Sequence, residues 1–394
     1  MGARYRWAAL ALCIALSGGA TYGLLKPALL PQTTLLHAAS AGSTGGTTAE
    51  LLTPGPLPQT TAAPTGKITP VPSARGAQAK TRISNYQAGV MVLIVGSDPS
   101  FVANIRRKFD YLASLGVNSV GLVFPIFQTN GGSTDVYADP KGTPSSGQIA
   151  VFVREAHKRG FTVMLRPLLD EGSLAASGDW RGSIHPQQVE AWFQSYGDLM
   201  VTYAALAKDQ GIEEFDVGTE FNSLESYGTQ WLQVISRVRQ AYNRRLTYSS
   251  LAGHGYPSKF ASGLDFLSVD AYFPLDAKAG ATPAELEKAW TPWIGQLKGM
   301  ATDSGLPLVV TEIGTASQSA SYRAPWTAPL GGTLDLEAQR SYYEAACTVL
   351  NGMVSGLYWW YMSQYTAPAA RTDTGYDPTG KPAEGEIARC FQQP

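Results

Sequence analysis

From residue 89 onward, short apolar runs alternate along the chain with longer segments whose apolar residues recur at helical spacing. The short runs predict eight strands, at residues 89–95, 119–125, 162–167, 214–220, 246–250, 266–271, 308–312 and 356–361. The longer segments predict helices, because their apolar residues would line one helix face. Four such faces are Phe101, Ile105, Phe109 and Leu112; Ile149, Val153 and Ala156; Trp231, Val234, Ile235 and Val238; and Leu286, Trp290, Trp293 and Leu297.

Glycines mark where several of these helices end. Gly116, Gly160, Gly211 and Gly305 each stand just before a predicted strand, where the last turn of a helix favours a left-handed residue. Eight strand–helix units in about 310 residues have the size and rhythm of a single (β/α)8 barrel, the TIM barrel of the α/β class. A doubly wound open sheet is the alternative, but it usually has fewer strands, and no glycine-rich phosphate loop follows the first strand.

Residues 1–26 have the pattern of a signal for export. Arg4 and Arg6 precede an apolar stretch at residues 7–16, and small residues follow at 17–20. The apolar stretch is short for a spanning helix. An uncleaved membrane anchor remains the alternative, because apolar residues resume at Leu24 and Lys26 follows them. We therefore expect a secreted, periplasmic or cell-surface protein.

Residues 27–82 are rich in Thr, Ala, Pro, Gly and Ser, as in Thr53-Pro54-Gly55-Pro56. Such a segment cannot bury enough apolar area to offset the entropy of the chain. It is predicted to be a flexible, partly extended linker. The folded domain is then expected to comprise residues 83–394.

Composition excludes some classes of partner and favours one. The net charge of −1 favours neither nucleic acid nor an anionic membrane surface. The 9 Trp and 19 Tyr among 394 residues suit sugar binding, because pyranose rings stack on aromatic faces, although they equally suit the core of a large domain. Four scattered His residues argue against a structural zinc site. Cys347 and Cys390 could form a disulfide or stay as two buried thiols.

Two glutamates end two of the predicted strands. Glu220 ends the fourth and Glu312 the seventh, and the C-terminal tips of barrel strands share one face. A carboxylate is costly to bury, so at a strand tip it usually carries chemistry rather than packing or a structural ion pair. Leu308, Val310 and Glu312 are expected to share the inner face of their strand, whereas Glu213 and Glu214, at the start of theirs, are expected to be solvated. Paired carboxylates suggest glycosidic bond hydrolysis, for which no metal or organic cofactor is needed.

A series of short motifs gives a more specific indication. They are Leu115-Gly116-Val117-Asn118-Ser119-Val120, Phe124-Pro125-Ile126-Phe127-Gln128, Gly160-Phe161-Thr162-Val163-Met164-Leu165-Arg166-Pro167, Asp179-Trp180-Arg181-Gly182, Val217-Gly218-Thr219-Glu220, Thr311-Glu312-Ile313-Gly314, Pro325-Trp326 and Leu357-Tyr358-Trp359-Trp360. Their order and spacing over about residues 85–365 resemble glycoside hydrolase family 113. The resemblance implies endo-β-1,4-mannan hydrolysis.

The placement of the two glutamates on the fourth and seventh strands resembles clan A, the large clan of retaining barrel glycosidases. This resemblance implies that Glu220 is the acid/base and Glu312 the nucleophile. Two departures weaken the mannan assignment more than the hydrolase assignment. Family members often have Lys-Pro-His where this chain has Arg166-Pro167-Leu168. They also tend to carry another acidic or aromatic residue in the stretch that here reads Trp360-Tyr361-Met362.

Further residues are candidates for substrate binding because they follow strand ends or lie in the loops there. They are Arg166, Trp180, Asn222, His254, Asp270, Tyr272, Trp326 and Trp360. Arg166 could hold a nucleophilic carboxylate ionised or form a structural salt bridge. Asn222 could bind a sugar hydroxyl or cap a loop helix. Trp359 and Trp360 alternate, so one of them faces the barrel; Trp360 is expected to, together with Tyr358 and Met362.

The sequence therefore predicts a monomeric retaining hydrolase of a β-linked polysaccharide or oligosaccharide. Two alternatives remain open. One is a hydrolase of another β-glycan, such as a glucan, a xylan or a bacterial exopolysaccharide. The other is a non-catalytic carbohydrate-binding barrel that takes part in exopolysaccharide handling, although such a site has no need of two carboxylates.

Overall fold

The computed structural model of the chain describes residues 85–95, 99–169, 171–176, 178–329, 331–364 and 372–392. The predicted export signal at residues 1–26 and the whole of the predicted linker at 27–82 lie outside these ranges, and both stay predictions. Within the described ranges, no helix has the length and hydrophobicity needed to cross a membrane.

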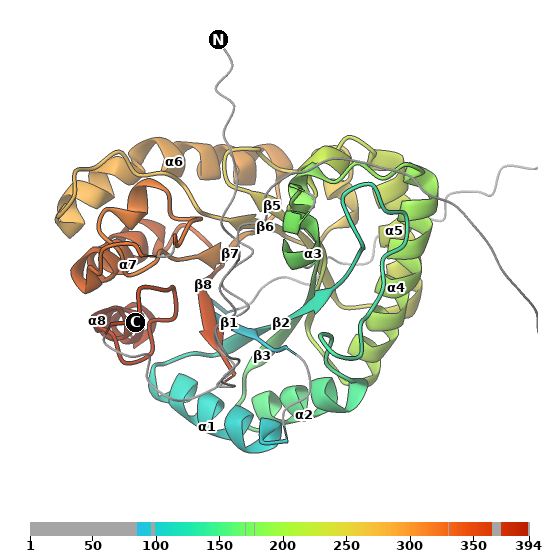
Figure 1. Ribbon diagram of the computed structural model, residues 1–394, viewed down its shortest axis with the longest axis horizontal. Coiled ribbons are helices and arrows are strands. Elements are labelled where there is room, and N and C mark those ends of the chain that lie inside the picture. The colour runs from blue at the N-terminus through green and yellow to red at the C-terminus, as the bar shows by residue number, and fades with distance from the viewer. Residues whose placement is uncertain are drawn as a thin grey trace, which may run out of the picture. The chain divides into compact units, whose positions relative to one another are not determined.

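Eight parallel strands close into a barrel, each pairing with the next in sequence and the last with the first. They are β1 (Gln87–Leu93), β2 (Ser119–Ile126), β3 (Thr162–Leu169), β4 (Glu214–Thr219), β5 (Arg245–Leu251), β6 (Leu267–Asp270), β7 (Leu308–Ile313) and β8 (Gly356–Ser363). The eight predicted strands and the predicted TIM barrel are confirmed. Figure 1 shows the strands at the centre and the large helices around them.

The helices are α1 (Phe101–Ser114), α2 (Ser146–His157), α3 (Glu171–Ala176), α4 (Val189–Asp209), α5 (Gly228–Ala241), α6 (Pro283–Ser304), α7 (Leu336–Leu350) and α8 (Pro382–Gln392). Helix α6 shows why they begin and end where they do. Thr282 and Glu285 form a reciprocal capping box, and Pro283 supplies the first helical residue. Gly305 then ends the helix at φ +65°, in the left-handed region that glycine adopts without strain.

The inside of the barrel is filled by a set of side chains that we call the inner cluster. Its members are Met91, Val123, Met164, Leu168, Phe266, Tyr272, Val309, Ala316, Tyr358, Trp360 and Tyr376. A second, larger cluster packs the outer face of the strands against the helices and contains Leu308 and Val310. The expectation that Leu308, Val310 and Glu312 share the inner face is therefore wrong.

The pairing of β7 explains this difference. Val309 belongs to the inner cluster, and the Thr311 hydroxyl reaches Asp270 and Ser249 inside the barrel. The register of β7 then shifts against both of its neighbouring strands, close to Glu312. A register shift interrupts the strict alternation of side chains. The side chain of Glu312 therefore also contacts residues at the barrel mouth.

Strand β8 departs from simple alternation in the same way. Tyr358 and Trp360 lie in the inner cluster, as expected. Trp359 faces outward and stacks on Tyr343 of α7, with ring centroids 4.1 Å apart. Met362 belongs to the outer cluster, contrary to expectation, because the pairing of β1 with β8 also shifts register before this residue. The peptide bond between Trp360 and Tyr361 is cis.

The N-terminal end of the barrel holds a buried acidic residue. Glu214 is fully buried, so the expectation that it is solvated is wrong, whereas neighbouring Glu213 is partly exposed. Glu214 accepts hydrogen bonds from Gln87 and from Arg245, whose Nε lies 3.0 Å from Oε1. Burial raises the pKa of the Glu214 carboxyl, and Arg245 opposes the rise. This residue therefore fills the floor of the barrel, far from the C-terminal strand tips.

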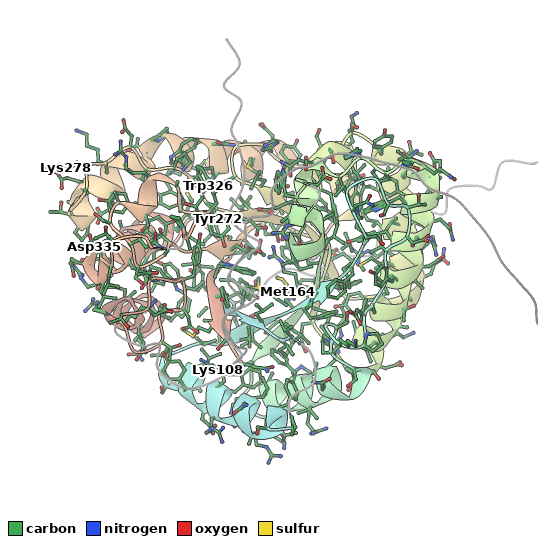
Figure 2. The ribbon with its side chains drawn as sticks, viewed as in Figure 1. Lys108, Met164, Tyr272, Lys278, Trp326 and Asp335 are labelled. Atoms are coloured by element: carbon green, nitrogen blue, oxygen red, sulfur yellow. A yellow bond between two sulfur atoms is a disulfide. The ribbon has the colours of Figure 1, made fainter. Side chains whose placement is uncertain are left out.

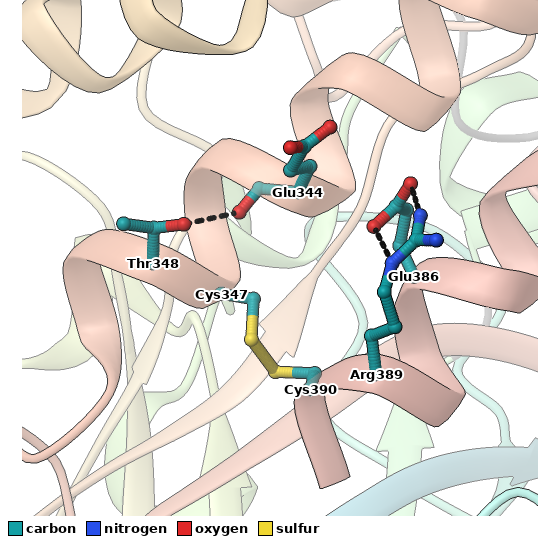
Figure 3. The surroundings of a disulfide bond; sticks show 6 residues. All are labelled: Glu344, Cys347, Thr348, Glu386, Arg389 and Cys390. Carbon is teal, nitrogen blue, oxygen red and sulfur yellow. Dashed lines mark hydrogen bonds and ion pairs between the residues drawn. A yellow bond between two sulfur atoms is a disulfide. The ribbon is translucent and has the colours of Figure 1, made fainter. Parts of the chain in front are cut away.

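Cys347 and Cys390 form a disulfide, which was one of the two sequence alternatives. The bond joins α7 to α8 (Figure 3), and the Cα atoms of the two cysteines are 5.7 Å apart. An ion pair between Arg340 and Glu386, with Nη1 2.8 Å from Oε1, joins the same two helices. The disulfide therefore fastens the last helix of the chain to the barrel.

Replacing both Cys347 and Cys390 with serine is expected to lower the free energy of unfolding by about 2–4 kcal/mol, because the bond closes a loop with a sequence separation of 43 residues in the unfolded chain. Urea unfolding of the two proteins would measure the difference. A reducing agent should destabilise the natural chain and leave the double variant unchanged, which serves as the control. Equal unfolding midpoints in oxidising buffer would contradict the expectation.

Candidate active site

Glu220 and Glu312 lie at the C-terminal mouth of the barrel, as the sequence predicted. Glu220 directly follows the last residue of β4, and Glu312 is the penultimate residue of β7. Both are buried, with 5% and 3% of their surface exposed. The charge of Glu220 raises the pKa of the Glu312 carboxyl, so the two groups are close enough to interact electrostatically. The two carboxyl groups therefore share one site.

Two donors hold the Glu312 carboxylate, one on each oxygen. Arg166 Nη2 donates to Oε1 at 2.6 Å, and the Tyr272 hydroxyl donates to Oε2 at 2.8 Å. Arg166 lies in the C-terminal half of β3, three residues before its end, and Tyr272 follows β6. A charge-assisted hydrogen bond on one oxygen and a phenol on the other leave the carboxylate little freedom to rotate. The structure thus brings both predicted residues into contact with Glu312.

Arg166 serves more than one carboxylate. Its Nη2 also donates to Asp270 Oδ2 at 2.8 Å, and its Nε lies 3.6 Å from Asp216 Oδ2. The guanidinium and both aspartates are fully buried. Asp270, one of the predicted substrate-binding residues, lies against Arg166. Asp216 was not among the sequence candidates, because it stands in the middle of the apolar run of β4 rather than at its tip.

The ionisation of Glu312 is set by competing influences. Burial raises the pKa of its carboxyl most strongly, and the charges of Asp270 and Glu220 raise it further. Arg166 and Arg181 act in the opposite direction. Burial also raises the pKa of Tyr272 far above its usual range, so its hydroxyl stays protonated and keeps donating to Glu312.

The backbone of Glu220 has an unusual conformation. Its φ of +52° is in the left-handed region, which few residues other than glycine adopt. Its N–H donates to the carbonyl oxygen of Ser249 at 2.8 Å. The next N–H, of Phe221, donates to the Tyr248 hydroxyl at 2.9 Å, which in turn donates to Glu225 at 2.9 Å. These bonds hold the strand end so that the Glu220 side chain meets the barrel mouth.

Arg181 contacts the Glu220 carboxylate and was missed as a candidate. It lies in η2 (Arg181–Ser183), a short turn in the loop after β3, and its side chain is 2% exposed. Nε donates to Glu220 Oε2 at 3.2 Å, and Nη1 donates to the carbonyl oxygen of Leu169 at 3.2 Å. The motif Asp179-Trp180-Arg181-Gly182 contained the signal, but only its tryptophan was selected as a site residue.

Aromatic residues line one side of the mouth. Trp360 of β8 is 8% exposed and belongs to the inner cluster together with Tyr272. Trp326, in the loop after β7, packs against the same cluster, and Figure 2 labels both Trp326 and Tyr272. Tyr376, which precedes α8, donates its hydroxyl hydrogen bond to the carbonyl oxygen of Pro325. Two predicted tryptophans thus lie on the side of Glu312.

The other predicted residues are less closely tied to the two glutamates. Trp180 is half-buried beside Arg181, and its ring covers Gly182 so closely that a Cβ there would be 2.2 Å from it. Asn222 is the first residue of η3 (Asn222–Leu224), whose N-cap is Phe221, so Asn222 does not take the capping position. Both of its amide atoms are buried and have no hydrogen-bond partner among the residues that the structure describes. His254 is exposed in the loop after β5, and no described contact brings its imidazole to either glutamate.

The described residues hold no group of three or more His, Cys, Asp or Glu side chains arranged to bind a metal ion. The chemical capacity of the site lies in its acidic and basic side chains. One oriented carboxylate and a second carboxyl beside an arginine face the same space, next to aromatic rings. Such an arrangement can protonate one side of a bond and attack from the other.

Comparison with known proteins agrees with this geometry. The model of glycoside hydrolase family 113 matches residues 102–381, which is more than half of the chain. The structure of the GH113 β-mannanase from Alicyclobacillus acidocaldarius in complex with ManMIm is 29% identical, with a TM-score of 0.70, covering 78% of this chain and 97% of that one. No curated protein sequence matches the chain.

Two further solved structures show the same fold at lower identity. A GH113 β-1,4-mannanase is 21% identical with a TM-score of 0.70, and the match covers 79% of this chain and 100% of that one. A glycoside hydrolase family 5 mannosidase from Rhizomucor miehei is 10% identical with a TM-score of 0.54, covering 78% and 92%.

Proposed function

The protein belongs to glycoside hydrolase family 113, a family of clan A. We propose that it hydrolyses internal bonds of a β-1,4-mannan or a related β-glycan, with retention of configuration. One observation carries the proposal. Glu312 is oriented by Arg166 and Tyr272, while a second carboxyl, Glu220, is held by Arg181 at the same barrel mouth. This is the two-carboxyl arrangement that glycosidic bond cleavage requires.

In the first step, a Glu312 oxygen attacks the anomeric carbon while Glu220 gives its proton to the leaving oxygen. The C–O bond to the leaving sugar breaks, and an ester between Glu312 and the glycosyl unit forms. The Tyr272 hydroxyl and Arg166 align Glu312 before the attack, and the charge of Arg166 opposes the rise in its pKa that burial causes.

In the second step, Glu220 acts as a base. Esterification removes the negative charge of Glu312, and the pKa of Glu220 falls because a neighbouring like charge has gone. Glu220 then takes a proton from water, which attacks the anomeric carbon and releases Glu312. Arg181, in contact with Glu220, stabilises the ionised form that this step needs.

The choice of a mannan-type substrate is supported by the family and by one structure. The matched family structure with 29% identity is a β-mannanase. Trp360 and Trp326 beside Tyr272 provide apolar rings on which a pyranose could stack. The chain departs from the family pattern at Arg166-Pro167-Leu168 and around Met362. Because Arg166 still donates to Glu312, these departures affect which sugar is accepted rather than whether the bond is cleaved.

The proposal is tested by incubating the enzyme with β-mannans, β-glucans, xylans and bacterial exopolysaccharides and measuring new reducing ends. We expect the highest rate on β-1,4-mannan, short oligosaccharides as early products, and a β-configured reducing end in the first NMR spectra. Binding without any new reducing ends would instead favour a non-catalytic carbohydrate-binding barrel. An α-configured first product would overturn the retaining mechanism, and cleavage of another glycan alone would overturn the mannan assignment.

A further inference from the structure

Below the two glutamates, four fully buried side chains from adjacent strands form a continuous line of polar contacts across the barrel. Asp216 lies on β4, Ser249 on β5, Asp270 on β6 and Thr311 on β7. Ser249 Oγ lies 2.6 Å from Asp216 Oδ2 and 3.1 Å from Thr311 Oγ1, and Thr311 Oγ1 lies 2.9 Å from Asp270 Oδ1. The line therefore has three links, with a carboxyl group at each end.

Counting protons shows that the line is one proton short if both aspartates are ionised. Each hydroxyl carries a single proton to donate. With two ionised carboxylates, Ser249 would donate to Asp216 and Thr311 to Asp270. The two hydroxyl oxygens would then meet at 3.1 Å with no proton between them. One proton on either aspartate completes all three links.

The contacts of the two aspartates show which end takes this proton. Asp270 Oδ2 accepts a charge-assisted hydrogen bond from Arg166 Nη2 at 2.8 Å. The nearest Arg166 atom to Asp216 is Nε, at 3.6 Å. We propose that Asp216 carries the third proton in the active enzyme and donates it to Ser249, so that it acts as a positioning residue for the Arg166–Glu312 pair. The proposal deepens the proposed function and rests on it.

The surroundings of Asp216 fit a neutral carboxyl group. Burial raises its pKa to about 6, and the charge of Asp270 adds to the rise. Arg166, the Ser249 hydrogen bond and the Gly218 N–H, which donates to Oδ1 at 3.2 Å, oppose it. From α4, Tyr196 faces the same strand, and its hydroxyl donates to the carbonyl oxygen of Val217 at 2.8 Å. Burial raises the pKa of Tyr196 as well, so it brings no charge.

A neutral Asp216 matters because one guanidinium serves three carboxyl groups. With Asp216 protonated, Arg166 is shared only by Asp270 and Glu312, both of which contact its Nη2. With Asp216 ionised, a third negative charge would lie beside the same cation and would raise the pKa of Glu312. The proton on Asp216 therefore reserves the positive charge of Arg166 for the carboxylate that attacks the sugar.

The first test is thermal unfolding of Asp216→Asn and the natural chain between pH 4 and 7. The Asn amide can also donate to Ser249, but it does not titrate. A folded-state pKa of about 6, against about 3.9 for an unfolded Asp, means that the natural chain loses stability as pH rises through this window. We expect the melting temperature of the variant, relative to that of the natural chain, to increase with pH. The corresponding ratio of the two unfolding constants should approach about a hundred-fold at the top of this pH range.

An exposed aspartate supplies the matched control. Asp198→Asn removes one carboxylate from the surface of α4, and any pH dependence that it shows is subtracted. A melting difference for Asp216→Asn that stays constant or falls with pH would overturn the proposal. This measurement needs no substrate, so it decides the proposal even if no glycan is cleaved and the proposed function fails.

The second test asks whether the proton positions Glu312. Asp216→Ala cannot donate to Ser249, and we expect its kcat to fall about tenfold or more at an unchanged KM, whereas Asp216→Asn recovers most of the loss. The acidic limb of kcat/KM against pH should coincide for the Asn variant and the natural chain, because the residue is already neutral there. A limb displaced to lower pH in the Asn variant would show that Asp216 was ionised, and would contradict the proposal.

Discussion

Replacing Glu312 with alanine is expected to abolish glycan hydrolysis, with kcat falling by about 10⁴-fold or more, because no other group can form the glycosyl ester. The fold should survive. Glu312 is buried, and the charge of Asp270 opposes its ionisation, so removing it leaves Arg166 still paired with Asp270. We expect an unchanged or higher melting temperature, measured together with the rate of reducing-end release.

A small anion can replace the missing carboxylate in this variant. Azide that enters the space left by Glu312 would attack the anomeric carbon from the same side and give a glycosyl azide of inverted configuration. Glu337→Ala, on the exposed side of α7, is a matched control that should keep full activity. Normal turnover in the Glu312 variant, or an azide product of retained configuration, would contradict the nucleophile assignment.

Replacing Glu220 with glutamine is expected to lower kcat on a polysaccharide by about 10²–10⁴-fold, the usual contribution of a general acid. The amide keeps the size of the side chain and its oxygen can still accept from Arg181. It cannot give a proton to the leaving oxygen. An aryl glycoside with an acidic phenol as leaving group needs no such proton, so its first step should remain fast, and a burst of phenol should precede slow hydrolysis of the ester.

The pH profile gives an independent readout for this variant. In the natural chain, kcat/KM should fall at alkaline pH as Glu220 loses its proton, and this alkaline limb should be absent from the glutamine variant on the aryl glycoside. Glu190→Gln, at the exposed start of α4, is the matched control for the same chemical change. An equal loss on both kinds of substrate would count against an acid/base role.

Most of the barrel could be predicted from the chain because strand and helix patterns are local. The eight apolar runs are each bounded by turn residues, and positions such as Gly305 mark helix ends. The long helix α4 was not among the predicted helical patterns. Its buried residues Trp192, Tyr196, Met200 and Tyr203 recur at helical spacing, so the pattern was present in the sequence.

The direction of individual side chains was less predictable. Strict alternation placed Leu308 and Val310 inside the barrel and Met362 beside Trp360, and all three face the outer cluster. Register shifts on both sides of β7, and between β1 and β8, break the alternation. Such shifts depend on how neighbouring strands pair, which a single strand does not reveal.

Candidate site residues divide along the same line. Glu220, Glu312 and Arg166 were identifiable because charged residues towards the C-terminal ends of strands are exceptions to an apolar pattern. Arg181 and Asp216 were missed, because one lies in a long loop and the other inside a strand. Their roles depend on partners distant in sequence, Glu220 for Arg181 and Ser249 for Asp216.

The amino-acid sequence by itself determined the order of elements, the closed barrel and the pair of carboxyl groups at its mouth, because hydrophobic periodicity and strand-end residues can be recognised within short segments of the chain. Only the tertiary structure decided which charges meet. Arg166 contacts Asp270 and Glu312, and Asp216 joins them through Ser249 and Thr311, because barrel closure brings the inner side chains of five different strands together in the buried interior.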